Sequence, residues 1–267
     1  MRIITLNVNG LRAAARKGFF DWLIQQEADV VCLQETRAQE HQLDAGWYPN
    51  GWKIYCFDAE KLGYSGVAII TPHMPDRVTE GLGWALADRE GRYIQLDFGR
   101  LSIASIYIPS GSHSEARQGC KFDFLNRYQA VLETHNQQDR EYILCGDWNI
   151  AHKPIDLKNW RANQKSSGFL PEERAWLDYV FDELGYVDAF RALNTEPEQY
   201  TWWSNWGRAW EKNVGWRIDY QVISPELKSK LISASIYKGR RFSDHAPLII
   251  DYEGDYFSNG QTKYSSF

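Results

Sequence analysis

Side chains that can bind a cation or move a proton stand at the ends of several apolar runs in this chain. These residues are Glu35, Asp147, Asn149, Asp244 and His245. Because side chains alternate along a strand and active sites gather at strand ends, we expect these groups to project into one cleft. The segments Ile4–Gly10 and Ile143–Asn149 resemble each other, since each is an apolar run that ends in two polar residues spaced by two. Two halves of the chain that meet at a shared cleft would explain this echo.

The residue types at these strand ends predict metal-assisted phosphate chemistry. Carboxylate and amide oxygens, without cysteine and with few histidines, suit Mg²⁺ better than zinc. A phosphodiester anion repels an attacking hydroxide, so a metal that neutralises this charge and a base that takes the proton of water would together catalyse hydrolysis. Glu35, Asp147, Asp244 and His245 are the candidates for these roles.

Each candidate also has a simpler explanation. A glutamate at a strand end is often structural or simply solvated. His245, taken alone, could be a core histidine that donates to a backbone carbonyl. The same pattern recurs at three places in the chain, and this recurrence favours a common site.

The elements that must position these residues alternate between β-type runs and helical segments. Helical spacing appears around Phe19–Ile24 and over Trp176–Leu184, where Pro171 opens and Gly185 closes the segment, and a further helix is predicted over Phe122–Thr134. So many strands imply two sheets, and the absence of a strict βαβ order favours a layered α/β sandwich over a barrel. The predicted strands are Arg2–Asn7, Val30–Glu35, Lys53–Asp58, Gly66–Thr71, Tyr93–Phe98, Leu101–Tyr107, Tyr142–Asp147, Arg217–Ser224, Ser233–Tyr237 and Pro247–Tyr252.

Length and composition indicate one large domain. No Pro- or Ser-rich linker divides the 267 residues, so we expect a single domain over residues 1–253 and a polar tail over residues 254–267. A net charge of -5 argues against a surface that is basic throughout, so any contact with nucleic acid must rely on a local patch or a metal. The 12 Trp, 15 Tyr and 12 Phe indicate either a thick core or a site that stacks on flat or sugar-like ligands.

The four cysteines and the N-terminus bear on the compartment. Cys32, Cys56, Cys120 and Cys145 show no metal-binding spacing, and buried thiols in a reducing compartment are favoured over disulfides. The sequence has neither a signal-type apolar region at its start nor an apolar span of about 18 residues. We therefore expect a cytoplasmic protein that does not bind a membrane.

Seven segments, in order along the chain, resemble the exonuclease III family of abasic-site endonucleases, within the endonuclease/exonuclease/phosphatase superfamily. The resemblance covers nearly everything from Arg2 to Tyr252. It implies a four-layer α/β sandwich of the DNase I type, with two central mixed sheets flanked by helices. The segments that carry it are Asn7–Arg12, Leu33–Glu35, Gly63–Val67, Tyr107–Gly111, Gly146–His152, Asn213–Tyr220 and Ser243–His245.

The resemblance also implies roles for individual residues. Glu35 and Asp244 resemble ligands of Mg²⁺, for which Mn²⁺ could substitute, and Asn7 belongs to the same cluster. Asn9 stands where some relatives carry aspartate, which argues against a metal role for it. The residues that resemble the catalytic groups are Tyr107, Asp147, Asn149, Asp219 and His245. Among these, Asp147 resembles the group that handles the proton of the attacking water, and Tyr107 and Asn149 resemble donors to the scissile phosphate. His245, oriented by Asp219, resembles either a phosphate contact or a general acid/base.

A further set of residues resembles the family's substrate-binding surface. Asn159 and Asn163 correspond to phosphate-binding amides in a DNA-backbone loop, although the same segment is also an ordinary polar surface loop. Trp202, Trp216 and Ile218 correspond to the lining of a small pocket for a flipped-out sugar that lacks its base, with Gly168 beside it. Trp206 corresponds to a side chain that inserts into the duplex. Arg217 belongs to the same motif and is included among the substrate-binding candidates.

These features together predict a DNA-repair phosphodiesterase. The expected substrates are double-stranded DNA with abasic sites, cut on their 5′ side, and damaged 3′ ends, and the expected enzyme is a monomer. The alternative is mainly a 3′ to 5′ exonuclease with weak activity on abasic sites. Two other classes are a DNA-binding protein with an inactive centre, which would lack some of the polar residues above, and a lipid or inositol phosphodiesterase, which would need a different binding surface.

Overall fold

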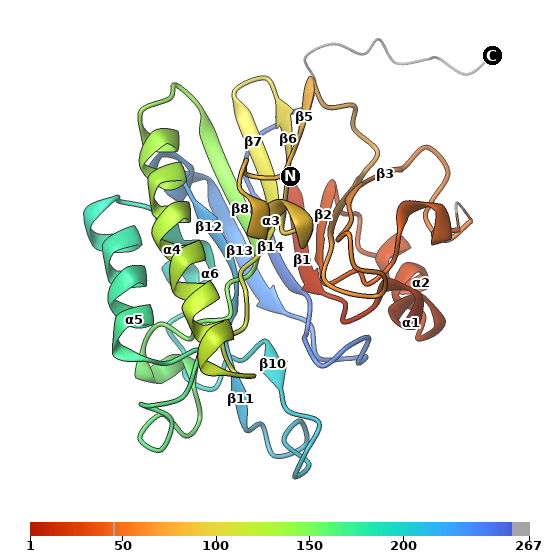
Figure 1. Cartoon of the computed structure of the whole chain (residues 1–267). Helices are drawn as coiled ribbons and strands as arrows, with labels where there is room; N and C mark the ends of the chain where they lie inside the picture. Colours follow the sequence, from red (N-terminus) through yellow and green to blue (C-terminus); the bar gives the residue numbers. More distant parts are fainter. Residues whose placement is uncertain (45, 258–267) are drawn as a thin grey trace, which may run out of the picture.

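Two six-stranded sheets stacked face to face form the centre of the molecule in the computed structural model, which describes residues 1–44 and 46–257 (Figure 1). The first sheet has the strand order β13-β14-β1-β2-β4-β3 and the second the order β5-β6-β7-β8-β12-β9. The first sheet consists of β1 (Arg2–Asn7), β2 (Val30–Gln34), β3 (Lys53–Phe57), β4 (Val67–Thr71), β13 (Leu231–Ile236) and β14 (Leu248–Tyr252). The second consists of β5 (Arg77–Glu80), β6 (Tyr93–Phe98), β7 (Leu101–Tyr107), β8 (Glu141–Asp147), β9 (Val187–Asp188) and β12 (Asp219–Ile223).

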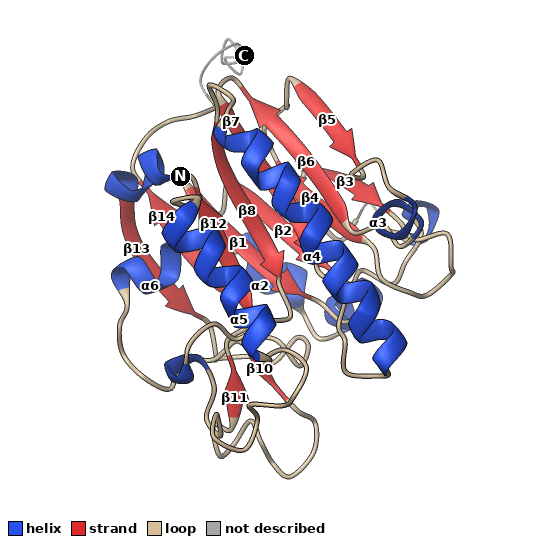
Figure 2. Ribbon diagram, turned by 60° about the vertical axis from the view of Figure 1, so that its left-hand side comes forward, coloured by secondary structure: helices blue, strands red, loops and turns tan. Residues whose placement is uncertain are grey.

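Helices cover the outer faces of the two sheets, which completes the four layers. Figure 2 shows α4 and α5 across the second sheet, with α2 behind the first. A small separate ribbon pairs β10 (Trp202–Trp203) with β11 (Gly215–Trp216). The α-helices are α1 (Leu11–Arg16), α2 (Phe19–Ile24), α3 (Ala85–Arg89), α4 (Glu115–Asn136), α5 (Pro171–Asp178) and α6 (Ala189–Leu193). Short 3-10 turns cover Glu40–Gln42, Pro154–Asp156 and Pro225–Lys230, and a π-helical turn covers Tyr179–Glu183.

Alternation along the central strands explains why both faces of each sheet are buried. In β1, Ile3 belongs to the core between the sheets, while Ile4 packs outward against α1 and α2. In β8, Ile143 faces the inner core and Leu144 faces α4 and α5. A strand buried on both faces is a nearly continuous apolar run, which is how the sequence identifies these segments. The predicted four-layer sandwich is confirmed.

Most predicted elements are confirmed, and their ends differ for local reasons. The helix predicted over Phe122–Thr134 begins earlier, at Glu115, because Ser114 caps it: its hydroxyl accepts a hydrogen bond from the Arg117 amide at 3.2 Å. The strand predicted to begin at Arg217 begins at Asp219. The Arg217 amide instead donates to the Asp156 carbonyl at 2.8 Å, outside the sheet.

The beginning of the predicted polar tail packs on the body of the protein. Phe257 stacks on His73 with ring centroids 3.9 Å apart and contacts Phe98 edge-on, and Tyr256 also packs on the inner core. The rest of the predicted tail, residues 258–267, lies outside the described residues. Within the described part of the chain, all four cysteines are free thiols. No helix there combines the length and apolar character that crossing a bilayer requires.

His135, at the end of α4, makes the stability of the fold depend on pH. Its ring stacks on Tyr142 at 4.0 Å, and burial lowers the pKa of His135 to about 4, against a smaller opposing effect of Asp97. Below pH about 6.5 the unfolded chain binds a proton that the folded chain does not, so stability falls as the pH drops from 6.5 towards 4.

We predict that His135→Phe, which keeps a stacked ring and removes the titrating group, loses less stability on acidification. Urea unfolding at pH 7.5 and pH 4.5 should give a difference in unfolding free energy that is smaller than in the wild type by about 2–3 kcal/mol. The matched control is His41→Phe, at an exposed histidine, which should leave this difference unchanged. Equal acid sensitivity of wild type and His135→Phe would contradict the prediction.

Candidate active site

One cavity of about 770 Å³ collects most of the residues that the sequence singles out. It opens at the edge where β1, β2, β7 and β8 end. The two parallel pairs end in register there, with Asn7 opposite Gln34 and Tyr107 opposite Asp147. The predicted residues that line the cavity are Asn7, Glu35, Tyr107, Asp147, Asn149, Gly168, Trp202, Trp216, Ile218, Asp244 and His245.

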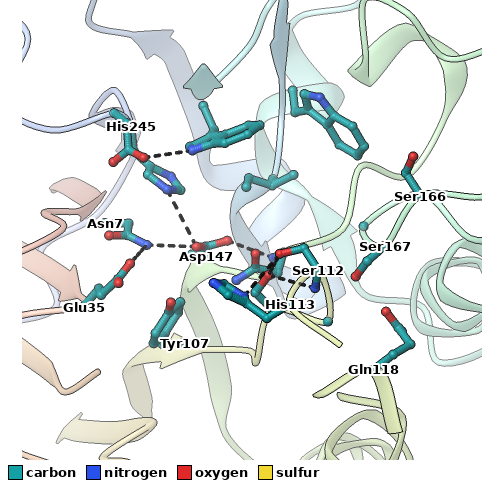
Figure 3. A pocket seen from close by; sticks show the side chains of 18 of the residues that line it. Asn7, Glu35, Tyr107, Ser112, His113, Gln118, Asp147, Ser166, Ser167 and His245 are labelled. Atoms are coloured by element: carbon teal, nitrogen blue, oxygen red, sulfur yellow. Dashed lines mark hydrogen bonds and ion pairs between the residues drawn. The ribbon is translucent and has the colours of Figure 1, made fainter. Parts of the chain in front are cut away.

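Asp147, His245 and Asp219 form a buried row at the floor of the cavity. The Nδ1 atom of His245 lies 2.8 Å from Asp219 Oδ2, and its Nε2 atom lies 3.9 Å from Asp147 Oδ2. Asp219 stands opposite Asp147 in the antiparallel pairing of β12 with β8. Figure 3 shows His245 and Asn7 both pointing toward Asp147. Asp219 is thus placed to orient the imidazole, and Asp147 faces the other ring nitrogen.

The charges of this row determine where its protons are held. Burial raises the pKa of Asp147 to about 7, and the neighbouring Asp219 adds to the effect. Burial by itself lowers the pKa of His245, but Asp219 above all, then Asp147 and Asp244, raise it to about 10. His245 is therefore a cation at neutral pH, and Asp147 can gain or release a proton near neutrality, as a residue that handles the proton of a water molecule must.

Asn7 connects Asp147 to Glu35. Its Nδ2 atom donates to Asp147 Oδ2 at 2.9 Å and to Glu35 Oε2 at 3.1 Å. Its Oδ1 atom accepts the Asn9 amide at 2.9 Å. The amide of Asn7 thus presents its hydrogens, and not its oxygen, to the carboxylates. This arrangement fits a role in orienting Glu35 and Asp147, and the metal role of Asn7 stays a prediction.

The remaining metal candidates keep oxygen donors facing the cavity. Asp244 accepts from Asn9 Nδ2 at 2.8 Å and from Trp202 Nε1 at 3.1 Å. Burial raises the pKa of Asp244, but His245 first, then Asn9 and Trp202, lower it below its ordinary value, so the group is anionic. Glu35 forms an ion pair with Arg37. With Asp147, Asp219 and His245, whose potential ligand atoms lie within 4.8 Å of one another, the set offers only oxygen and imidazole donors. Such a set suits a hard cation.

Tyr107 is supported by a buried arginine that sequence reasoning missed. The guanidinium carbon of Arg92 lies 4.7 Å from the centre of the Tyr107 ring, and Arg92 Nη1 donates to the Tyr107 carbonyl at 2.8 Å. Burial, and then the charge of Glu35, raise the pKa of Tyr107 well above its ordinary value, while Arg92 lowers it. Tyr107 is therefore a neutral phenol that can donate a hydrogen bond. In the sequence, Arg92 directly precedes the apolar run Tyr93–Phe98, and a charge at this position could have identified it.

Trp202, Trp216 and Ile218 form an apolar pocket next to this polar row. The two indole rings meet edge-on with centroids 6.4 Å apart, on the paired strands β10 and β11. Gly168 closes one wall with φ +91°, and a Cβ atom there would lie 3.1 Å from the Asn149 carbonyl oxygen and 3.3 Å from the Trp216 ring. A side chain at position 168 would be strained and would crowd the pocket.

Several predicted substrate residues lie outside the cavity lining. Arg217 is one of them: its side chain is fully buried and pairs with Asp156 at 2.8 Å and Asp188 at 2.6 Å. This double ion pair leaves the guanidinium no exposed surface for a substrate, so the structure places Arg217 as a support of the loop.

The other outlying candidates remain at the surface. Asn163 donates to the carbonyl of Asn159 at 2.9 Å, within their own loop, and Trp206 is 85% exposed on the loop that follows β10.

Residues that sequence reasoning missed also reach the cavity. Several come from the loop after β7 and the start of α4, where Figure 3 labels Ser112, His113 and Gln118, and Arg37 and Leu170 also line the cavity. The segment Ser112–Gln118 continues the quoted stretch Tyr107–Gly111, which was the one signal for it.

Known proteins share this sequence and fold over nearly the whole chain. The model of the Endonuclease/Exonuclease/phosphatase family matches residues 4–245. An exodeoxyribonuclease of Bacillus subtilis (strain 168) is 39% identical, and the match covers 93% of this chain and 98% of that protein. A DNA-(apurinic or apyrimidinic site) endonuclease of Dictyostelium discoideum is 37% identical over 93% of this chain and 69% of its own length. The structure of an AP endonuclease from Archaeoglobus fulgidus superposes with a TM-score of 0.86 at 24% identity, over 95% of this chain and all of that one. The chain is therefore a member of the endonuclease/exonuclease/phosphatase family.

Proposed function

We propose that this protein is a Mg²⁺-dependent DNA-repair nuclease that hydrolyses the DNA backbone 5′ to abasic sites and also trims 3′ ends. The observation that carries the proposal is the direct connection between the apolar pocket and the charged row. Trp202 forms a β-bridge with His245, and its indole Nε1 donates to Asp244. A sugar seated against Trp202 would therefore place its phosphate beside Asp244 and His245.

The apolar lining of the pocket supports an abasic substrate. Extruding a nucleotide from the duplex costs little when no base has to be unpaired or unstacked. Gly168, Trp216 and Ile218 leave an apolar space that suits a bare sugar better than a nucleotide with its base. Selectivity would then follow from shape and from the cost of extrusion together.

The row of Asp147, His245 and Asp219, together with the polar residues around it, supplies the hydrolytic chemistry. Glu35 and Asp244 would hold Mg²⁺, with Mn²⁺ as a substitute, and the bound ion would offset the charge of the phosphate. Asp147 accepts the proton of the attacking water. Asp219 keeps the imidazolium of His245 directed at the phosphate, where its charge stabilises the transition state. Tyr107 donates its phenol hydrogen to the same phosphate.

Asn149 completes the set of donors. Its Nδ2 atom donates one hydrogen to the Ile108 carbonyl at 2.9 Å, which leaves the second hydrogen for the phosphate. The backbone amide of Asn149 donates to Asp147 Oδ1 at 2.8 Å, so the phosphate donor and the base hold each other in place.

Local positive charge toward the duplex comes from the loop that follows β8. Lys165 lines the cavity, while Arg161 stacks on Trp160 at 4.6 Å and Lys158 pairs with Glu198. These side chains would contact the DNA backbone, which the net negative charge of the protein otherwise repels.

A second candidate is a predominantly 3′ to 5′ exonuclease with weak activity on abasic sites. The name of the Bacillus subtilis relative, an exodeoxyribonuclease, favours it. Both candidates use the same charged row and differ in how well the apolar pocket accepts its substrate.

A cleavage assay separates the two candidates. One duplex carries an internal tetrahydrofuran abasic analogue, and an otherwise identical intact duplex carries a recessed 3′ end. We expect faster cleavage of the first, on the 5′ side of the analogue, and loss of both activities on addition of EDTA, with recovery on excess Mg²⁺. Faster trimming of the intact duplex would favour the exonuclease, and cleavage that persists in EDTA would refute metal dependence.

Asp147→Asn should abolish cleavage of both duplexes. We expect kcat to fall by roughly 10²–10⁴-fold, because the amide cannot accept the proton of water. Asn has nearly the same shape, so the melting temperature and duplex affinity should stay close to wild type. The control Asp123→Asn changes an exposed carboxylate on α4 and should retain full activity. Wild-type rates in Asp147→Asn would remove Asp147 from the mechanism.

Trp206→Ala should weaken binding of the abasic duplex. We expect a loss of about tenfold in affinity if the exposed indole wedges into the duplex beside the lesion, since stacking contributes about 1–3 kcal/mol per base. The side chain is 85% exposed, so the melting temperature should not change. Ile232→Ala, at a residue of β13 that is 61% exposed, serves as the control in the same fluorescence anisotropy titration. Equal affinity of Trp206→Ala and wild type would discard the wedge.

A further inference from the structure

A fully buried ion pair lies beneath the cavity and has no role in the chemistry described above. Lys121 of α4 and Glu173 of α5 meet with Nζ and Oε1 2.7 Å apart, and neither side chain is exposed at all. Removing two charges from water is expensive, so a buried pair of this kind is weak evidence for a contribution to stability. What else each partner holds is therefore informative.

Lys121 holds the backbone of the phosphate donor. Its Nζ atom donates to the carbonyl oxygen of Asn149 at 2.7 Å. Asn149 has a φ of +54°, in the left-handed region, directly after the end of β8. A non-glycine residue in this conformation is strained and persists only where its surroundings hold it. The lysine supplies such a restraint from the buried interior, since Asn149 lines the cavity and Lys121 does not.

Glu173 holds the wall of the apolar pocket. Its Oε2 atom accepts the amide of Gly168 at 2.7 Å and the amide of Leu170 at 3.0 Å. Its Oε1 atom, besides binding Lys121, accepts from Gln118 Nε2 at 3.0 Å. The carboxylate thus fixes the turn whose glycine closes the pocket against Trp216.

The two held segments also touch each other. The amide of Ala151, two residues after Asn149, donates to the Gly168 carbonyl at 2.8 Å. A Cβ atom on Gly168 would meet the very carbonyl that Lys121 binds. One ion pair therefore lies under both the donor to the phosphate and the wall that selects the sugar.

We propose that Lys121 and Glu173 are positioning residues, with Lys121 fixing Asn149 against the scissile phosphate and Glu173 fixing the Gly168 wall that selects the abasic sugar. The proposal rests on the proposed function. It adds the ion pair that aligns the phosphate donor with the wall of the sugar pocket. An apolar pair of the same volume would pack equally well, but it could not bind the Asn149 carbonyl or the Gly168 amide.

Three variants test the proposal on the two duplexes of the cleavage assay. Lys121→Met should lower kcat on both substrates by the same factor, about 10–100-fold with little change in KM, because Asn149 serves the phosphate of either substrate. Glu173→Met, which leaves no acceptor for the Gly168 amide, should lower cleavage at the abasic analogue at least fivefold more than trimming of the intact 3′ end, because the Gly168 wall shapes the sugar pocket.

The double variant Lys121→Met/Glu173→Met separates positioning from folding. With both charges gone, its melting temperature should return toward the wild-type value, while kcat on both substrates stays low. Arg127→Met, which breaks an exposed ion pair on the same helix α4, is the matched control and should leave rates and their ratio unchanged. A double variant with wild-type stability and wild-type rates would overturn the proposal, as would single-variant losses that follow the folded fraction alone.

A readout without substrate distinguishes failure of this proposal from failure of the proposed function. In ¹H–¹⁵N spectra, Glu173→Met should shift the Gly168 amide resonance, and Lys121→Met should shift the resonance of Ile150, whose amide belongs to the peptide that Lys121 binds. Wild-type protein that cleaves neither duplex would refute the function, and the positioning would then be judged on these resonances. Unchanged resonances in both variants would refute the positioning whatever the enzyme cleaves.

Discussion

The site depends on holding Asp147, Asp219 and His245 side by side where little of any of them is exposed to water. A buried charge is tolerated only where partners of opposite charge and fixed hydrogen bonds replace the solvent. His245 lies between the two carboxylates, and Asn7 and the Asn149 amide satisfy the oxygens of Asp147. The same burial gives Asp147 a pKa of about 7, so the cost of desolvation is also what makes the group useful as a base.

The two sheets provide the rigidity that this row needs, and buried polar bonds fix how they sit on each other. Gln34 of β2 donates to Ser105 of β7 at 2.9 Å, and Gln221 of β12 donates to the Ile3 carbonyl of β1 at 3.0 Å. An apolar interface alone would tolerate small slips between the sheets, whereas these directional bonds do not. The bond from Asn7 to Asp147 joins the ends of the same two sheets within the site itself.

The apolar pocket and the charged row are connected through their backbones, because the segments that carry them are hydrogen-bonded to each other. The Trp203 amide donates to the Asp244 carbonyl at 3.1 Å, and the Ala246 amide donates to the Thr201 carbonyl at 2.7 Å. The Thr201 hydroxyl accepts the amides of Ile218 and Asp219, each at 3.1 Å. A shift of the pocket strand would therefore displace Asp244 and Asp219 as well, so recognition of the sugar and alignment of the phosphate are mechanically linked.

The sequence by itself determined the central strands, the layered fold and the polar residues at the strand ends. Runs such as Val30–Gln34 have the length and apolar character of buried strands, and Asp147 and Asp244 stand beside such runs. The family resemblance added Trp202, Trp216 and Ile218, which composition alone would have assigned to the core.

Only the tertiary structure decided which way each side chain points and what lies behind it. Arg217 and Ile218 are adjacent in sequence, yet one is locked into an ion pair and the other lines the pocket. The supports of the site, Arg92, Lys121 and Glu173, come from segments far from the motifs and become neighbours of Tyr107, Asn149 and Gly168 only after folding. Local pattern fixes the type and spacing of residues, whereas long-range packing sets their orientation and charge environment, because those depend on partners that no window of sequence contains.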